Sequence, residues 1–421
     1  MPSADLSRRA VVTGLGAVTP IGNDAETFWA NLLAGVPGGG PITSFDPTGY
    51  DVRIAAEVKD FDPTVAMDRK MARRMSRFIH FAMAAATEAV NRSGLDFSGW
   101  DPERRDRVGV AINTGGGGME QVIEGTATLE TKGPGQVSPF AIPALSGSMG
   151  AAQVSIKYGL SGPVITQVAA CASGVIAFLD GLRLIKTGEC DVVIAGGTEA
   201  PLLPVAFAAL ANMGALSKRN DDPQGASRPF DRTRDGFVYG EGAGVLVLES
   251  AAHALERGAP ILAEVIGAAL TADAFHISAP EPTGRGAMRA MTNAMRMAGI
   301  APDEVDEIVA HGTSTSLNDV TETRAIKAAF GDHARRVPVT APKSMLGHML
   351  GGAGGAAAVA AVSSIRDGWI PPTINYHEPD PECDLDYVPN VKRQVRVETA
   401  MINGFGFGGQ NAVAVFRRFE P

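Results

Sequence analysis

Cysteine and aromatic residues are scarce in this 421-residue chain, which holds three Cys and only 6% Phe, Trp and Tyr. Three cysteines cannot form the disulfide framework of a small secreted protein, so we expect free thiols and a cytoplasmic location. The longest stretch of small apolar residues, 349–362, is shorter than the ~20 residues that cross a bilayer, so no membrane segment is expected. An apolar run near the start is interrupted by Gly14, Gly16 and Pro20, and we interpret it as a buried strand and turn rather than a secretion signal.

Positive charge is also in short supply, with 37 Lys and Arg against 46 Asp and Glu and a net charge of −9. An acidic chain is a poor candidate for nucleic-acid binding. Glycine is abundant, at 50 residues, yet the runs at 14–16 and 240–244 lack the spacing of a dinucleotide or Walker-type phosphate loop. We therefore expect no nucleotide cofactor, and we expect the glycines to serve tight turns and close backbone contacts.

Strand-like apolar segments alternate with helical ones along the chain, which is typical of an α/β fold with buried sheets. A capping box of Asn23 and Glu26 predicts a helix that ends at Gly35. The other predicted helices span 69–92, 175–186, 286–298 and a Gly/Ala-rich segment through 365. The predicted strands span 10–13, 108–112, 164–169, 191–195, 244–248, 261–266, 307–310, 337–340, 401–403 and 412–416.

The two halves of the chain repeat one order of features. Each has a strand, a loop with reactive side chains, a helix of small residues, a glycine that ends the helix, and another strand. The segments 164–188 and 337–368 show this order side by side, although few of their residues are identical. We therefore predict two related halves, an N-terminal one at 1–258 and a C-terminal one at 259–421.

Cys171 lies between a predicted buried strand and a predicted helix, a strand-turn-helix geometry that can expose a nucleophile. The N-terminus of the following helix would lower the pKa of the thiol and favour the thiolate. Small neighbours, including Ala170, Ala172 and Gly174, leave room for a bulky acyl group. The plain alternative is an inert buried thiol, which is how we interpret Cys190 and Cys383.

His311 and His348 each lie on a glycine-flanked turn. His311 comes just after a predicted strand, and His348 comes just before a predicted helix. Polar groups beyond the carboxyl ends of strands often form the sites of α/β proteins. A single such histidine is often structural, but a pair favours a functional role. One thiol with two imidazoles could also bind zinc, an alternative that we do not favour.

Four motifs in this order are together similar to the β-ketoacyl-acyl carrier protein synthases, condensing enzymes with a Cys-His-His site. They are Ala170–Gly174, His311–Thr315, Lys343–His348 and Asn403–Gly409. Two further segments, Asp231–Phe237 and Asp273–His276, most resemble the synthase II subtype. The resemblance implies a thiolase-like, five-layered αβαβα fold built from two related halves. It also implies a homodimer, and a reaction that uses no cofactor and no metal.

The resemblance assigns a reaction to these residues. Cys171 takes an acyl chain from acyl carrier protein or coenzyme A, because thiolates react readily with thioesters. A malonyl thioester then loses carbon dioxide, and the N–H groups of His311 and His348 stabilise the enolate oxygen. The carbanion attacks the acyl-Cys171 carbonyl, whose oxygen is held by the backbone N–H groups of Cys171 and Phe407. The product is a 3-oxoacyl-carrier protein with two more carbons.

Five further residues are given roles by the same resemblance. Lys343 and Glu322 are expected to form an ion pair that orients His311. Phe405, Thr313 and Thr315 are expected to bind substrate.

Two positions depart from the pattern of the family. The family often has Ile where this chain has Gly116, and Phe where it has Ala141. Because both positions line the acyl pocket in the resemblance, the smaller residues predict a wider pocket that accepts long or unusual acyl chains. Bulky neighbours that fill the space are the alternative.

A basic cluster stands out in this acidic chain. At helical spacing it would present two neighbouring rows of positive charge. Such a surface suits the docking of an acidic carrier protein, although a solvated helix face is an equal alternative. The cluster consists of Arg69, Lys70, Arg73, Arg74 and Arg77.

Three rival enzymes or proteins share parts of this pattern. A thiolase needs a second catalytic cysteine near the C-terminus, where Gly404–Gly409 offers none. A type II polyketide ketosynthase shares the three proposed catalytic residues and stays open. A non-catalytic chain-length partner subunit is disfavoured because Cys171 is retained.

Overall fold

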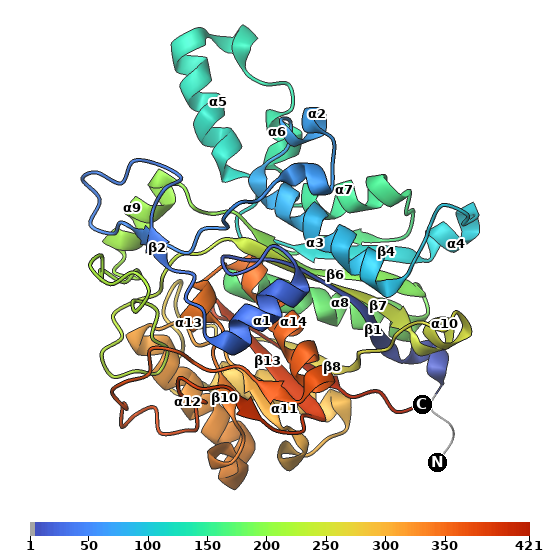
Figure 1. Ribbon diagram of the computed structural model, residues 1–421, viewed down its shortest axis with the longest axis vertical. Coiled ribbons are helices and arrows are strands. Elements are labelled where there is room, and N and C mark those ends of the chain that lie inside the picture. The colour runs from blue at the N-terminus through green and yellow to red at the C-terminus, as the bar shows by residue number, and fades with distance from the viewer. Residues whose placement is uncertain (1–4) are drawn as a thin grey trace.

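The computed structural model describes residues 5–421 and contains one ten-stranded sheet system in which each half of the chain supplies five strands (Figure 1). The strands of the N-terminal half are β1 (Ala10–Val18), β4 (Val108–Asn113), β5 (Val164–Ile165), β6 (Val192–Glu199) and β7 (Gly242–Ser250). Those of the C-terminal half are β8 (Ala263–Ala272), β9 (Glu307–Val309), β10 (Val339–Thr340), β13 (Thr399–Gly406) and β14 (Gln410–Arg417).

The two sets of strands have the same topology. From the outer edge inward, the order is β5-β4-β6-β7-β1 in one half and β10-β9-β13-β14-β8 in the other. If the strands of each half are numbered along the chain, both halves have the spatial order third, second, fourth, fifth and first. The parallel and antiparallel pairs also correspond between the halves. The sets meet only where Ala10–Val12 pairs with Ala263–Val265. The fold is therefore built from two related halves.

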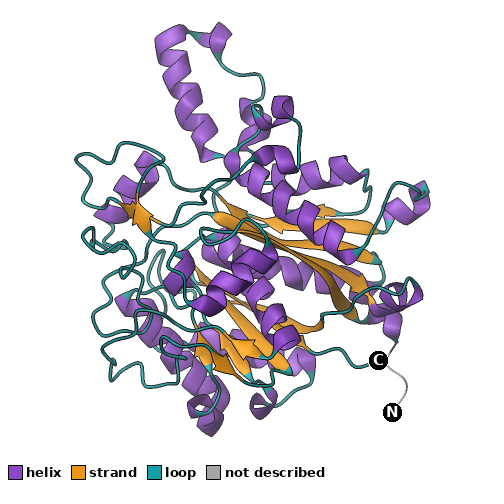
Figure 2. Ribbon diagram, in the orientation of Figure 1, coloured by secondary structure: helices purple, strands orange, loops and turns teal. Residues whose placement is uncertain are grey.

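Helices and sheets stack in five layers (Figures 1 and 2). The central layer holds two helices that contact both sheets, α8 (Ser173–Thr187) and α14 (Gly351–Asp367). The outer face of the first sheet is covered by α3 (Arg77–Ser93) and α7 (Met149–Tyr158). The outer face of the second is covered by α11 (Arg285–Ala298) and α12 (Ser316–Phe330). This αβαβα arrangement is the one that the resemblance to the condensing enzymes implied.

Small residues make the central layer possible. Every residue of α14 from Gly351 to Ile365 is buried, and most are Gly or Ala. A Cβ on Gly355 would overlap the backbone of Gly244 in β7, and one on Gly354 would overlap Val175 in α8. The helix therefore packs backbone against backbone, which brings the two sheets close together.

The glycines predicted to end helices are confirmed, but the residue predicted to cap the first helix is not. Gly35, Gly188 and Gly368 all have positive φ and end α1 (Ala25–Ala34), α8 and α14. The N-cap of α1 is Asp24, whose carboxylate accepts the Thr27 N–H at 2.8 Å. The prediction of Asn23 as the cap was wrong by one residue, because the Asn23 side chain instead donates to the Lys59 carbonyl.

Two predicted elements are different in the structure. The helix expected at 69–92 is broken into α2 (Arg69–Ala72) and α3, because Ser76 is extended and its hydroxyl donates to the Ala144 carbonyl. The buried strand expected at 164–169 is reduced to the two residues of β5. This strand is at the edge of the sheet, paired only with β4, and so it is partly exposed rather than buried.

The remaining elements are short or peripheral. Helix α5 projects from the body of the molecule (Figure 1). No helix among the described residues is long and apolar enough to span a membrane. These elements are β2 (Gly40–Pro41), β3 (Ile54–Ala55), α4 (Pro102–Asp106), α5 (Met119–Lys132), α6 (Ala141–Leu145), α9 (Pro204–Asn212), α10 (Ala251–Glu256), α13 (Lys343–Leu346), β11 (Trp369–Ile370), β12 (Arg393–Gln394) and six 3₁₀ turns at Leu6–Arg8, Pro63–Val65, Pro134–Gln136, Ala170–Ala172, Pro302–Glu304 and Gly331–Arg335.

Candidate active site

Cys171 lies in the 3₁₀ turn Ala170–Ala172, directly before α8. Asn113, the last residue of β4, holds this turn in place: its amide group donates to the Ser173 carbonyl at 2.9 Å and accepts the Gln167 N–H at 2.8 Å. Ala170 has a φ of 48°, a region that side-chain-bearing residues rarely adopt. The surrounding hydrogen bonds therefore maintain a strained backbone next to the thiol, as is common at functional sites.

The environment of the Cys171 thiol is more apolar than the sequence suggested. Burial raises the pKa of the thiol to about 12, although the nearby charge of Lys343 and the backbone N–H groups of Phe407 and Cys171 act in the opposite direction. The expectation of a lowered pKa is thus not met, because desolvation of the thiolate outweighs the stabilising groups. The resting thiol is protonated at neutral pH, and its proton must leave when a thioester is attacked.

His311 and His348 face one another at the same site. Their ring centroids are 5.3 Å apart with planes at 84°, and both residues are buried. Burial and the nearby Lys343 charge lower the pKa of each imidazole well below its ordinary value, so both rings are neutral at neutral pH. The ring of Phe405 packs against His311, and that of Phe237 against His348. Within residues 5–421, the Nδ1 atom of His348 has no hydrogen-bond partner.

Lys343 and Glu322 hold the main chain of His311 from two directions. The Lys343 Nζ donates to the His311 carbonyl at 2.5 Å. The Glu322 carboxylate accepts the N–H groups of His311 at 2.8 Å and of Gly312 at 2.7 Å. The expected ion pair between the two side chains is absent from the described residues, where no N–O distance within 4.0 Å joins them. Each therefore positions His311 through the backbone rather than through the other.

A cavity of about 230 Å³ brings the thiol and both imidazoles together. Its walls are formed by the turn before α8, the loop between β9 and α12, the end of β13 with the loop that follows it, and the segment between α13 and α14 that carries His348. Parts of the loops at 213–215, 235–237 and 273–280 complete the lining. Its volume suits part of a thioester substrate, and its lining combines buried residues such as His311 and His348 with exposed ones such as Leu317. Of the residues singled out in the sequence, those that line it are Cys171, His311, Thr313, Thr315, His348, Phe405 and Phe407.

Four other sequence candidates do not line this cavity. Lys343 and Glu322 lie behind His311, as described above. The N–H of Gly116 donates to the Glu199 carboxylate at 3.0 Å, and Ala141 begins α6 in a partly exposed position. That these two positions widen an acyl pocket stays a prediction.

The basic cluster does not form two rows on one helix, because the chain breaks between α2 and α3. The Arg77 guanidinium is engaged by the buried Glu241 carboxylate at 2.7 Å. Arg74 lies over the ring of Phe140, 4.4 Å from its centroid. Arg69, Lys70, Arg73 and Arg74 are exposed, and none of the four forms an ion pair with an acidic side chain among the described residues.

Comparison with known proteins decides the family. A model of the β-ketoacyl synthase N-terminal domain matches residues 7–254, and a model of the C-terminal domain matches residues 262–377. The chain belongs to the β-ketoacyl synthase family. The 3-oxoacyl-[acyl-carrier-protein] synthase 2 of Synechocystis is 49% identical over 98% of this chain and 99% of the relative. The protein of the same name from Coxiella burnetii is 47% identical over the same shares.

Solved structures of synthases have the same fold. A β-ketoacyl synthase from Burkholderia phymatum matches with a TM-score of 0.90 at 34% identity. The ketosynthase structure described as a type II PKS acyl-carrier protein in complex with its ketosynthase bound to the hexaketide matches with a TM-score of 0.89 at 35% identity. Each match covers 98% of this chain and 100% of the other.

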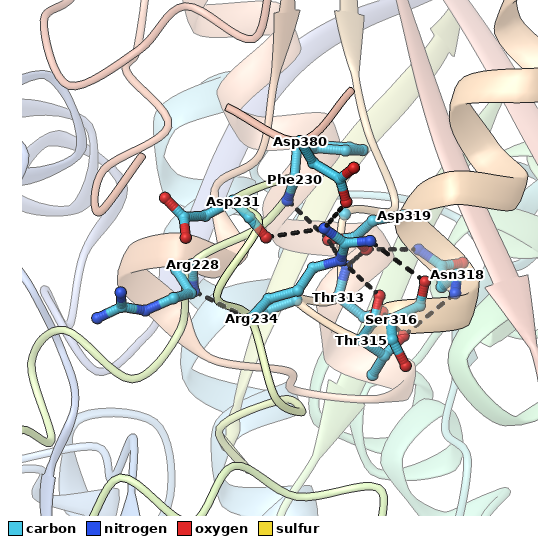
Figure 3. Close-up of polar contacts among 12 residues, drawn as sticks. Arg228, Phe230, Asp231, Arg234, Thr313, Thr315, Ser316, Asn318, Asp319 and Asp380 are labelled. Atoms are coloured by element: carbon cyan, nitrogen blue, oxygen red, sulfur yellow. Dashed lines mark hydrogen bonds and ion pairs between the residues drawn. The ribbon is translucent and has the colours of Figure 1, made fainter. Parts of the chain in front are cut away.

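A buried polar cluster that sequence reasoning left without a role supports the cavity wall of this synthase (Figure 3). The guanidinium of Arg234 donates to Asp380 at 2.6 Å and to the Thr315 carbonyl at 3.1 Å, and it lies 3.6 Å from Asp319. Asp319 in turn accepts the Thr313 N–H at 3.1 Å. The cluster thus fixes the loop that follows His311. One signal was visible in the sequence, since Asp319 precedes Glu322 by three residues and shares its face of the helix.

Proposed function

We propose that this synthase is a 3-oxoacyl-acyl carrier protein synthase of fatty acid biosynthesis, which elongates an acyl chain by two carbons. The observation that carries the proposal is the convergence of one thiol and two neutral imidazoles on one cavity. The relatives named 3-oxoacyl-[acyl-carrier-protein] synthase 2, at 47–49% identity over nearly the whole chain, support this reaction.

In the first step the Cys171 sulfur attacks the carbonyl of an acyl thioester. The carrier thiol leaves and takes up the proton that the Cys171 thiol gives away, so one thioester replaces another. The backbone N–H groups of Phe407 and Cys171 interact with the Cys171 sulfur and are thus close to where the oxyanion of this step forms. Phe407 is followed by Gly408 and Gly409, both with positive φ, and we infer that this loop forms a gate to the acyl site.

In the second step a malonyl thioester loses its carboxylate as carbon dioxide, and the bonding electron pair passes to the enolate. His311 and His348 each have an N–H that can donate to the enolate oxygen. Neutral rings suit this role, because an imidazolium is a stronger acid and would protonate the carbanion. The carbanion attacks the acyl-Cys171 carbonyl, the carbon–sulfur bond breaks, and the thiolate regains a proton.

Two features support partners for this reaction. Arg69, Lys70, Arg73 and Arg74 are the exposed members of the basic cluster that have no acidic partner among the described side chains, and we infer that an acidic acyl carrier protein docks there. We also infer a homodimer, because exposed apolar residues gather on α5 to α7, on the open edge strand β5 and just after it. The residues that a second copy would cover are Met119, Val122, Ile123, Ile142, Ile156, Val164 and Val168. Light scattering should give a dimer that Val164→Lys weakens; a monomeric wild type would contradict the inference.

The two halves and the compartment complete the proposal. We place the division at 258/259, between the end of α10 and the start of β8, so that the N-terminal half carries Cys171 and the C-terminal half both histidines. We infer a cytoplasmic site of action, since all three cysteines of the described chain are free and a reducing compartment preserves free thiols.

The alternative is the ketosynthase of a type II polyketide system. It is supported by structural neighbours of that class, including an ishigamide ketosynthase/chain length factor at 36% identity. The higher identity to the fatty acid synthases favours our proposal. Within residues 5–421, no group of three or more His, Cys, Asp or Glu is arranged to hold a metal ion.

An elongation assay with acyl- and malonyl-carrier protein tests the proposal. Cys171→Ala should abolish condensation, and His311→Ala should block decarboxylation while acyl transfer to Cys171 persists. Condensation that survives in Cys171→Ala would remove the central assignment. Loss of acyl transfer in His311→Ala would contradict the division of roles. A polyketide enzyme would instead condense several malonyl units onto one chain without an intervening reduction.

A further inference from the structure

Glu199, the last residue of β6, is a buried carboxylate that the proposed reaction does not use. It accepts four hydrogen bonds, two at each oxygen. Oε1 accepts from the Thr114 hydroxyl at 2.8 Å and the Gly116 N–H at 3.0 Å, while Oε2 accepts from the Gly115 N–H at 2.6 Å and the Gly351 N–H at 3.0 Å. Although burial raises the pKa of this carboxyl, all four neighbouring groups donate, and so they fit the ionised form.

These four donors come from segments that touch the catalytic candidates. A Cβ added to Gly115 would lie 3.2 Å from the carbonyl oxygen of Ala170, the residue before Cys171. A Cβ added to Gly351 would lie 2.7 Å from the Gly115 nitrogen. Gly351 begins α14 and follows His348 by three residues. One carboxylate thus joins the loop that supports the thiol to the helix that follows an imidazole.

The C-terminal half of the chain also contains a buried carboxylate that accepts the N–H groups of a loop after a strand. The loop 114–116 follows β4, and the loop 311–313 follows β9, which occupies the equivalent place in the second sheet. Glu199 collects the N–H groups of Gly115 and Gly116, just as Glu322 collects those of His311 and Gly312. The two carboxylates come from different elements, β6 and α12, so the arrangement is not explained by the repeat alone.

We propose that Glu199 is a positioning residue for acyl transfer, which fixes the segment carrying Cys171 relative to the start of α14 and so to His348. This inference rests on the proposed function. In addition to burial, the negative charge of Glu199 raises the pKa of the Cys171 thiol. Glu199 therefore holds the nucleophile in place and at the same time disfavours its thiolate. These two effects act on the reaction in opposite directions, which makes them separable.

Glu199→Gln tests the proposal. The amide keeps the size of the side chain, but its NH₂ group faces two of the four donors and leaves them without an acceptor. Acylation of Cys171 by acyl-carrier protein, followed by intact-protein mass, should slow by about tenfold or more in kcat, with a much smaller change in KM. Decarboxylation of malonyl-carrier protein by the unacylated enzyme should stay within about threefold. Alkylation of Cys171 by iodoacetamide should move to lower pH, because the repelling charge is gone.

The combination of slower acyl transfer with a more acidic thiol is the signature of positioning. If acyl transfer becomes faster together with alkylation, Glu199 acts through its charge alone and the proposal is wrong. If acyl transfer is unchanged in Glu199→Gln while the wild type acylates normally, the proposal fails and the proposed function stands. A wild type that does not acylate Cys171 would instead overturn the proposed function.

Two further variants guard against a folding defect. Thr114→Val removes one of the four donors without removing charge and should slow acyl transfer less than Glu199→Gln does, whereas Thr114→Ser keeps the hydroxyl and should restore it. Equal rates in the two Thr114 variants would contradict the proposal even if Glu199→Gln does not fold. Glu307→Gln is the matched control, because Glu307 is equally buried but lies at the start of β9, away from the cavity.

Discussion

The two halves of the chain share a topology but contribute different chemistry to the cavity. The connection from β5 to α8 carries Cys171, and the equivalent connection from β10 to α14 carries His348. The loop after β9 carries His311, whereas its counterpart after β4 consists of Thr114 and glycines. The repeat thus places two helix starts at one cavity, and the side chains on each then determine which step that half serves.

The largest effect expected from this comparison is on the C-terminal half. His348→Ala should lower malonyl decarboxylation by about 100-fold, because one of two donors to the enolate oxygen is lost, while acylation of Cys171 continues. Release of carbon dioxide and intact-protein mass measure the two steps separately. His377→Ala, an exposed histidine outside the cavity, is the control. Equal losses in both steps would show that the halves do not divide the reaction.

A smaller effect should come from the carboxylate that holds His311. Glu322→Gln should lower decarboxylation by about tenfold, since the His311 and Gly312 N–H groups lose part of their acceptor. Acyl transfer should change much less, which is the reverse of the pattern expected for Glu199→Gln. Both variants should be measured in the same assays of decarboxylation and acyl transfer. If both lose the same step, the comparison between the halves is wrong.

A third difference between the halves concerns stability. β4 begins with Val108, but β9 begins with Glu307, whose side chain is buried with Ser364 as its one hydrogen-bonding partner. Burial raises the pKa of Glu307 to about 8, above the 4.5 expected in the unfolded chain. The folded form therefore keeps a proton that the unfolded form loses, so the free energy of unfolding falls as pH rises from about 4.5 to 8.

Glu307→Gln should remove this pH dependence, because the amide does not ionise. At pH 7 the variant should be more stable than the wild type by about 3 kcal/mol, with little difference near pH 4.5. Urea unfolding at several pH values measures both curves. A difference that does not change with pH would mean that Glu307 is ionised or solvated in the folded protein.

The sequence predicted most of the framework because its signals are local. Strands 108–112 and 244–248 are continuous apolar runs, and Gly188 and Gly368 end their helices where φ must be positive. That Cys171, His311 and His348 share one site was expected from the resemblance to the condensing enzymes, whereas the strands and the helix ends were indicated by local sequence. In these cases neighbouring residues contain the physical cause of the structure.

The predictions that failed or were missed depend on distant contacts. The break in the helix at 69–92 arises from the hydrogen bond between Ser76 and Ala144, 68 residues away. Glu199 and Gly351 are 152 residues apart, so nothing near either one indicates their pairing. The raised pKa of the Cys171 thiol likewise results from burial of this side chain in the folded protein, which local sequence does not reveal.

The backbone-to-backbone packing of α14 limits which substitutions this enzyme can accept. Since a methyl group on Gly355 would collide with the main chain of β7, the spacing between the layers cannot be adjusted by ordinary substitutions there. The packing of α14 therefore fixes the distance between the Cys171 sulfur and the imidazole rings of His311 and His348. Adaptation to new substrates is left to the loops at the periphery, which can vary while the centre stays the same.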